Sequence, residues 1–292
     1  MLVILFCMAA GFLAHKLGYL GGETDQKLCR LILGITMPCL ILGSVSAGDT
    51  LPSAGEILSI LKVAAVFYGL GFLTAAFVPR LLGGTAKQQG VWRYCLVFAN
   101  MAFIGYPVSV ALFGQDALFY AVILVLPFNL LSFSLGPLML AGQAKFRWQQ
   151  LTSPCVIAAV AALVVALCRL NIPALAGECL NFVGSLTTPL SLLVVGSLLA
   201  DLPFGRAFTS LRLWILTALR LLILPGVLWL VLKWTGIGTP LVDDIAVILM
   251  ATPAALNGSM LAMEYGGDVE SMAQATFLTT VCAMVTVPLI AT

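Results

Sequence analysis

Two stretches of the chain combine helix-breaking residues with side-chain amides that can bind an anion. The first places Asn100 five residues before the triplet Gly105-Tyr106-Pro107, and the second places Pro253 four residues before Asn257. Proline lacks a backbone donor and glycine tolerates unusual dihedral angles, so we predict a helix interruption in each stretch. The half-helix after an interruption begins with unpaired amides and a partial positive charge. Together with the asparagine side chains, these ends would attract a carboxylate.

These candidates lie in a chain with the composition of a membrane protein. Of its 292 residues, 61% are hydrophobic and 9% are charged, whereas a soluble domain carries about 25% charged residues. This composition excludes a soluble enzyme, and the net charge of +2 gives no reason to expect a nucleic-acid partner. The eight cysteines lie mostly in apolar runs, as buried hydrophobes do. The single histidine, His15, leaves almost no material for a metal site or a catalytic pair, so we predict no catalytic residue, metal or cofactor.

Ten apolar stretches have about the length that a helix needs to cross a bilayer. They cover roughly residues 1–20, 28–47, 57–79, 91–113, 117–141, 154–170, 178–200, 211–234, 244–264 and 269–291. Ten Lys and Arg residues fall in alternate loops, starting after the first stretch, and two fall in the opposite loops. The positive-inside rule then places both termini outside the cytoplasm. We therefore expect a multi-pass, all-α protein of the inner cell membrane, surrounded by the lipid bilayer.

The two halves of the chain share motifs at a nearly constant offset. Thr36-Met37-Pro38 matches Thr187-Thr188-Pro189 at an offset of 151, and Pro137 matches Pro288 at the same offset. Phe113-Gly114 matches Tyr265-Gly266 at an offset of 152, and both pairs are followed two residues later by an aspartate. Five stretches per half is an odd number, so the second half must enter the membrane from the opposite side. Inverted repeats of this kind are typical of secondary transporters with a midplane substrate site.

The repeat divides the chain into residues 1–141, a basic cytoplasmic linker at 142–153, and residues 154–292. At the offset of 152, Asn257-Gly258-Ser259 stands opposite Gly105-Tyr106-Pro107, so the predicted interruptions lie at equivalent depths. The repeat is the sole reason for including Asn257 among the predicted site residues. No Asp or Glu falls near the middle of a stretch, which disfavours ion exchange on an intramembrane carboxylate.

Other polar residues also lie inside the predicted spans. Arg220, about three turns into the eighth stretch, has two interpretations: bidentate binding of a substrate carboxylate, or snorkelling towards the cytoplasm. Asn129 lies in the fifth stretch, where it would either line the crossing point or hydrogen-bond between helices.

The order of these motifs resembles the auxin efflux carrier family of bacteria and plants. The resemblance covers essentially the whole chain and is carried by Asn100-x4-Gly105-x-Pro107, Phe113-Gly114, Thr252-Pro253, Tyr265-Gly266-x-Asp268, Thr36-x-Pro38 and Ser153-Pro154. It implies a fold like that of bile acid–sodium symporters. Stretches 1, 2, 6 and 7 would then form a scaffold, and stretches 3–5 and 8–10 a moving transport domain in which stretches 4 and 9 cross. It also implies an organic-anion substrate, and the short central linker suits a bacterial member.

We predict from these observations a secondary transporter of small organic anions, either mono- or dicarboxylates, that works by alternating access. The predicted substrate-binding residues are Asn100, Gly105, Tyr106, Pro107, Asn129, Arg220, Pro253, Asn257 and Ser259. Two alternatives stay open: a sodium-coupled symporter of the bile-acid type, and a membrane sensor that retains the transporter fold. A homodimer is compatible with the sequence.

Overall fold

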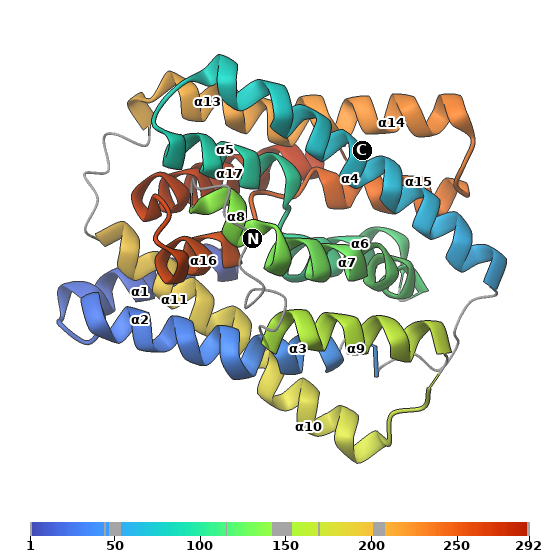
Figure 1. The fold of residues 1–292 in the computed structure, drawn as a ribbon, viewed down its shortest axis with the longest axis horizontal. Coiled ribbons are helices and arrows are strands. Elements are labelled where there is room, and N and C mark those ends of the chain that lie inside the picture. Colours follow the sequence, from blue (N-terminus) through green and yellow to red (C-terminus); the bar gives the residue numbers. More distant parts are fainter. Residues whose placement is uncertain are drawn as a thin grey trace.

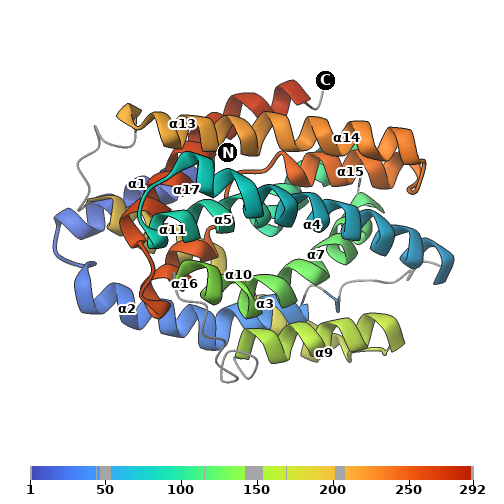
Figure 2. The ribbon, with the colours of Figure 1, turned by 45° about the horizontal axis from the view of Figure 1, so that its top comes forward.

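The computed structural model describes residues 2–43, 45–46, 54–114, 116–141, 154–168, 170–200 and 208–290. Within these ranges the chain is almost entirely helical, and the β-structure is one isolated bridge between Ala99 and Ala254. The predicted linker, residues 142–153, lies outside the described residues. In Figures 1 and 2, α2, α3 and α9 lie on one side of the molecule, and α13, α14 and α15 lie on the other.

The first half of the chain contains α-helices and two short π-helical segments, η1 and η2. Their bounds are α1 Leu2–Lys16, α2 Gly22–Leu31, η1 Ile32–Thr36, α3 Met37–Gly43, α4 Ala54–Leu82, α5 Ala86–Val97, η2 Met101–Gly105, α6 Tyr106–Phe113, α7 Asp116–Ser134 and α8 Gly136–Leu140. Helix α5 begins with a capping box, in which Thr85 and Gln88 satisfy each other's backbone amides.

The second half shows a similar alternation of long and interrupted helices. Their bounds are α9 Pro154–Cys168, α10 Ala174–Ser185, α11 Thr187–Ala200, α13 Leu211–Ala218, η4 Leu219–Ile223, α14 Leu224–Thr235, α15 Pro240–Met250, α16 Asn257–Tyr265 and α17 Val269–Ile290. Among the described residues, four continuous helices are long and apolar enough to cross a membrane: Gly22–Gly43, Gly55–Leu82, Leu211–Thr235 and Val269–Ile290. They coincide with the second, third, eighth and tenth predicted stretches.

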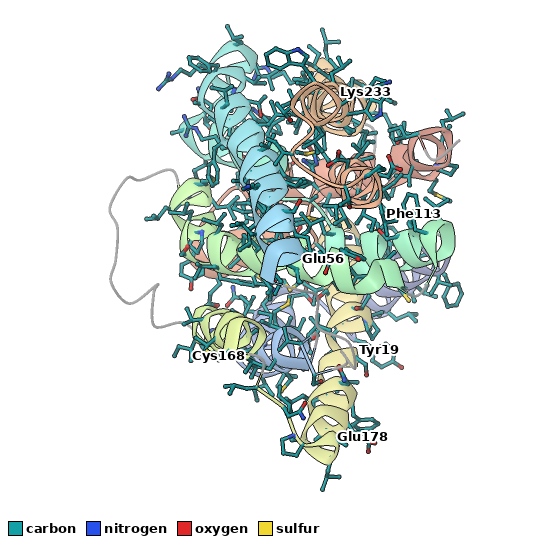
Figure 3. The ribbon with its side chains drawn as sticks, turned by 90° about the vertical axis from the view of Figure 1, so that its right-hand side faces the viewer. Tyr19, Glu56, Phe113, Cys168, Glu178 and Lys233 are labelled. Atoms are coloured by element: carbon teal, nitrogen blue, oxygen red, sulfur yellow. The ribbon has the colours of Figure 1, made fainter. Side chains whose placement is uncertain are left out.

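Large apolar side chains face outwards from helices at the edge of the molecule. Phe182 on α10 is 78% exposed and Trp234 on α14 is 89% exposed. Figure 3 shows Glu178 and Lys233, which belong to the same two helices, at the periphery of the structure. The ammonium group of Lys233 lies 4.6 Å from the centre of the Trp229 ring, so its charge is held beside an aromatic face. An apolar exterior of this kind is suited to lipid rather than water.

Helices α1 and α11 approach each other closely at two glycines. A Cβ atom added at Gly11 would meet the backbone of Leu193, and one added at Gly196 would meet the backbone carbonyl of Met8. Backbone atoms cannot swing away as the end of a side chain can. Glycine, whose side chain is a single hydrogen atom, therefore lets these two helices pack closely at both positions. Small residues have the same effect between membrane helices in general.

A buried carboxylate joins the same region, although the sequence placed it in a loop. Asp25 lies in α2 and is 2% exposed. Its Oδ2 atom accepts a hydrogen bond of 2.7 Å from the Ser197 hydroxyl on α11, and its Oδ1 accepts one of 3.1 Å from the Gly21 amide. The Ser197 hydroxyl also lies 2.9 Å from Nδ1 of His15 on α1. The chain's one histidine thus ties α1 to α2 through a serine and an aspartate.

Replacement of Ser197 by alanine should lower stability, because it leaves Asp25 buried without its hydroxyl donor. We expect a loss of about 1–3 kcal/mol, measured as a fall in the unfolding temperature of the detergent-solubilised protein. Ser185→Ala is the matched control, because the Ser185 hydroxyl is exposed and donates to the carbonyl of Phe182 in its own helix. Equal unfolding temperatures for the two variants would contradict a stabilising role for the His15–Ser197–Asp25 chain.

Candidate functional site

Two interrupted helices meet at the isolated β-bridge. Helix α5 ends at Val97 and is followed by the extended residues Phe98 and Ala99, whereas α15 ends at Met250 and the next helix starts at Asn257. The amide of Asn100 donates to the carbonyl of Pro253 at 2.8 Å, and the amide of Ala255 donates to the carbonyl of Phe98 at 3.1 Å. The two unwound segments therefore satisfy each other as a short antiparallel pair, which we call the crossing (residues 98–100 and 251–256).

A third backbone donor of the crossing is satisfied by a side chain of α17. The hydroxyl of Thr279 accepts a hydrogen bond of 3.2 Å from the Ala254 amide and donates one of 2.7 Å to the Ala275 carbonyl. Thr279 is fully buried. Unwound backbone at membrane depth persists only where protein groups or a cavity satisfy it, and here α17 supplies part of that support.

The interruptions lie earlier than the sequence predicted. In the first half the break is at residues 98–100 and not at Gly105-Tyr106-Pro107, where the chain stays helical from Met101 to Phe113. A local π-helical adjustment before Pro107 lets the helix accommodate a residue without an amide hydrogen. The wider π-helical turn Met101–Gly105 leads into this helix. In the second half, Pro253 lies in the break as expected, but Asn257-Gly258-Ser259 form the first turn of α16. The paired residues, Ala99 and Ala254, are separated by 155 positions rather than 152.

A small cavity of about 50 Å³ adjoins the crossing. It brings together four of the predicted residues: Asn100, Tyr106, Asn129 and Asn257. Its other walls come from α3, from η2, from α7 and from the crossing itself; they are Met37, Leu40, Ile41, Ala99, Met101, Val125, Phe128, Ala255 and Leu256. None of these lining side chains carries a formal charge, so an anion here would be held by amides, a phenol and helix ends.

The Asn100 side chain has an unused donor in this cavity. Asn100 is 3% exposed, and its Nδ2 atom has no hydrogen-bond partner among the described residues. Its backbone is fully committed, because its amide binds Pro253 and its carbonyl accepts from Ile104 and Gly105 at 3.3 Å each. A buried amide without a partner costs free energy. The arrangement therefore leaves a fixed donor for an acceptor that enters the cavity.

Asn257 lines the same cavity, but both ends of its side chain are already paired. Its Oδ1 accepts a hydrogen bond of 3.0 Å from the Tyr94 hydroxyl, and its Nδ2 donates one of 3.1 Å to the Ser132 hydroxyl. The Tyr94 and Ser132 hydroxyls are themselves 2.9 Å apart. This closed triangle joins α16, α5 and α7 beside the crossing. Tyr94 and Ser132 were not among the predicted site residues.

Replacement of Tyr94 by phenylalanine should loosen the crossing, because it leaves the buried Asn257 Oδ1 without its donor. We expect the free energy of unfolding to fall by about 1–2 kcal/mol, read as a lower unfolding temperature. Tyr19→Phe is the control, because Tyr19 is 75% exposed. A Tyr94→Phe protein as stable as the control would show that the triangle does not contribute to the fold.

The remaining predicted residues do not line the cavity. Gly105 packs under α15, since an added Cβ would meet the Leu249 side chain. Ser259 is fully buried and its hydroxyl has no partner among the described residues, but it does not line the cavity. Arg220 is also fully buried and lies away from the cavity: its Nη1 donates to the Leu96 carbonyl at 3.1 Å and lies 3.4 Å from the Met250 sulfur. It does not snorkel to an interface.

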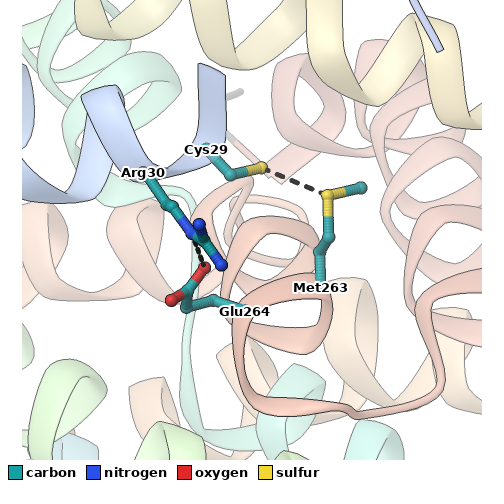
Figure 4. A network of polar contacts seen from close by, with 4 residues as sticks. All are labelled: Cys29, Arg30, Met263 and Glu264. Carbon is teal, nitrogen blue, oxygen red and sulfur yellow. Dashed lines mark hydrogen bonds and ion pairs between the residues drawn. The ribbon is translucent and has the colours of Figure 1, made fainter. Parts of the chain in front are cut away.

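A second contact region lies at the far end of α16. Figure 4 shows Arg30 and Glu264 joined by an ion pair, with Nε 3.3 Å from Oε2, and Cys29 beside Met263, with their sulfur atoms 3.6 Å apart. A cavity of about 180 Å³ lies here, lined by Arg30, Leu33, Gly34, Phe133, Pro154, Cys155, Leu261, Glu264 and Tyr265. Burial, together with the charge of Glu264, raises the pKa of Tyr265, so its phenol is neutral at physiological pH. Glu264 is about 10 Å along α16 from Asn257.

The described residues contain no group of three or more His, Cys, Asp or Glu side chains that could hold a metal ion. The crossing thus offers amide and hydroxyl groups and backbone dipoles for binding, but no paired acid and base. Interrupted, crossing helices with a polar cavity between apolar walls are typical of a membrane carrier.

The comparison with known proteins identifies the family. The model of the membrane transport protein family, which is of the auxin efflux carrier type, matches residues 1–145 and 137–291. The chain therefore belongs to this family, which confirms the resemblance seen in the sequence. Family and relatives are transporters, so the protein is a transporter and not an enzyme.

Three relatives cover almost the whole chain. An "Uncharacterized transporter" of Methanothermobacter thermautotrophicus is 24% identical over 99% of this chain and 95% of the relative, and one of Methanocaldococcus jannaschii is 25% identical over 99% and 96%. A "Putative malonate transporter" of Rhizobium meliloti is 22% identical over 95% of this chain and 89% of the relative.

Proposed function

We propose that the protein is a secondary carrier of small organic anions, with malonate and similar short carboxylates as the class to test first. The observation that carries the proposal is the Nδ2 atom of Asn100, which has no partner in the described part of the chain and is buried beside two unwound helix ends in an uncharged cavity. A carboxylate accepts hydrogen bonds without bringing a donor of its own, so it complements this site. The relative named for malonate supports the same class.

We also propose ten membrane spans arranged as two inverted repeats, residues 1–141 and 154–292, with both termini outside the cytoplasm. Two features support the repeat. Thr36 ends the π-helical segment η1, and its counterpart Thr187 begins α11 directly after a turn at Leu186, so both motifs mark a helix irregularity. Gly114 and Gly266 both have positive φ, 87° and 71°, and follow α6 and α16.

Alternating access would arise from movement of one helix group against the other. The scaffold would comprise α1–α3 and α9–α11, and the transport domain the remaining helices with the crossing. The cavity lies at their boundary, because Met37, Leu40 and Ile41 of α3 face the crossing residues. A volume of about 50 Å³ holds one or two waters at about 30 Å³ each. The described conformation is therefore contracted, and α3 and the crossing must separate to admit a carboxylate.

Uptake by purified protein in liposomes tests the proposal. Labelled malonate, malate, acetate and an indole acid should be compared with a cationic control, each with and without a sodium gradient and at two pH values. Saturable anion uptake supports a carrier, and dependence on the sodium gradient would favour a sodium-coupled symporter. Anion binding without flux would favour a sensor that retains the fold. Absence of both binding and flux across the anion panel would contradict the proposed function.

A further inference from the structure

Arg220 presents an electrostatic problem that the carrier proposal does not use. Its side chain is fully buried in the π-helical segment η4, between α13 and α14. No carboxylate pairs with it among the described residues, and its Nε and Nη2 atoms have no partner there. An isolated charge in the interior is costly unless an opposite charge or dipole lies close by. Some other negative potential must therefore stabilise the guanidinium.

The two neighbours of Arg220 show where that potential comes from. Leu96, whose carbonyl accepts its hydrogen bond, is the penultimate residue of α5, and Met250 is the last residue of α15. The C-terminal ends of the two interrupted helices thus converge on one guanidinium. Each helix end carries roughly half a negative charge, so the pair offers about one unit of negative potential. One arginine offsets it.

At the opposite ends of the crossing, the described residues supply no such partner. Helices η2 and α16 begin on the other side of the unwound segments, and helix N-termini carry partial positive charge. The residues that line the cavity there include no carboxylate. Because Arg220 neutralises the negative helix ends, the positive potential of the other two helix ends is not cancelled. Without a neutralising charge, the partial charges of the four helix ends would cancel one another.

We propose that Arg220 is the internal counter-charge that makes the crossing selective for anions. Arg220 would be a positioning residue that does not contact the substrate. By neutralising the negative ends of α5 and α15, it would leave a positive electrostatic potential at the binding site. The inference rests on the proposed carrier function and goes beyond it. Because only one donor of the guanidinium reaches a protein oxygen among the described residues, its charge matters more than its hydrogen-bonding pattern. A lysine should therefore replace it better than a neutral donor.

Three substitutions separate charge from shape: Arg220→Lys keeps the charge, Arg220→Gln keeps a donor, and Arg220→Met keeps the bulk. Malonate affinity should be measured on each variant in detergent, beside the wild type. We expect the lysine variant to bind within about threefold of wild type and both neutral variants to bind at least about tenfold more weakly. Met250→Leu, which removes only the sulfur neighbour, should bind as the wild type does. Neutral variants that fold and bind malonate normally would overturn the proposal.

A second readout needs no substrate. Asn100→Asp installs a carboxylate at the crossing, and its titration can be followed as the pH dependence of the unfolding temperature. The carboxylate should titrate at least about one pH unit higher when Arg220→Met is added, because the positive potential is then lost. Tyr106, the titratable side chain that lines the cavity, is a phenol, and phenols titrate far above the range of a carboxylate, so it does not interfere.

The two readouts distinguish the possible failures. A wild type that neither binds nor transports any anion contradicts the carrier proposal, while the titration of the Asn100→Asp proteins still decides the role of Arg220. Identical titrations with and without Arg220 overturn the counter-charge. If only the lysine variant folds, the charge serves the fold rather than anion selection, and the inference is wrong.

Discussion

Replacement of Asn100 by alanine should abolish most anion uptake while leaving the protein as stable as the wild type. The Asn100 amide donor has no partner among the described residues, so its removal breaks no hydrogen bond of the substrate-free fold. A hydrogen bond to a charged group contributes about 1.5–3 kcal/mol, which corresponds to roughly a 10- to 100-fold loss of affinity. The measurements are initial malonate uptake in liposomes and the unfolding temperature in detergent.

Replacement of Asn257, which lines the same cavity, should instead lower the stability of the protein. Asn257→Ala breaks two hydrogen bonds, with Tyr94 and with Ser132, so it should lower the unfolding temperature. Asn181→Ala is the neutral comparison, because Asn181 is exposed on α10 and its side chain donates a long hydrogen bond, of 3.4 Å, to the Ser46 hydroxyl. Malonate uptake by Asn100→Ala at the level of Asn181→Ala would remove the main support for a substrate site at the crossing.

The sequence was sufficient to find the crossing but not to place its breaks. Proline and glycine signal a weak point in a helix, and Pro253 does lie in the unwound segment. In the first half, however, Phe98, Ala99 and Asn100 unwind without a helix breaker, because Phe98 and Asn100 are held by the partner segment from the other half. Such pairing is a long-range property and leaves no local signal. The expected break at Pro107 failed because the π-helical turn Met101–Gly105 accommodates the proline within a continuous helix.

The polar residues of the site were found more readily than their roles. A polar side chain in an apolar stretch identified Asn100, Asn129, Asn257 and Arg220, and three of these four line one cavity. Their roles depend on partners far away in sequence: Asn257 is occupied by Tyr94 and Ser132, and Arg220 by the ends of α5 and α15. Asp25 falls between the first two predicted stretches, and its burial depends on a serine partner 172 positions away, which leaves no local signal.

A reversible cross-link between α2 and α16 should stop transport. Arg30 belongs to the proposed scaffold and Glu264 to the proposed transport domain, and their side chains form an ion pair with 70% and 33% of their surfaces exposed. An exposed pair of this kind contributes little to stability, so Arg30→Cys with Glu264→Cys should fold normally. A short bis-methanethiosulfonate reagent would then join the two helices covalently. If the two groups must slide past each other to open the cavity, uptake should fall at least about tenfold and return after reduction.

The native cysteines require that this experiment be compared with matched variants. All eight remain present, and Cys168 and Cys179 are exposed, so the single variants Arg30→Cys and Glu264→Cys must be treated with the same reagent. Only the double variant should lose uptake, and a monofunctional reagent should leave it active. Malonate binding in detergent should fall as well, because the cross-link holds the cavity in its contracted state of about 50 Å³. Full uptake by protein shown by mass spectrometry to be cross-linked would mean that α2 and α16 travel together, and the boundary between scaffold and transport domain would then have to lie elsewhere.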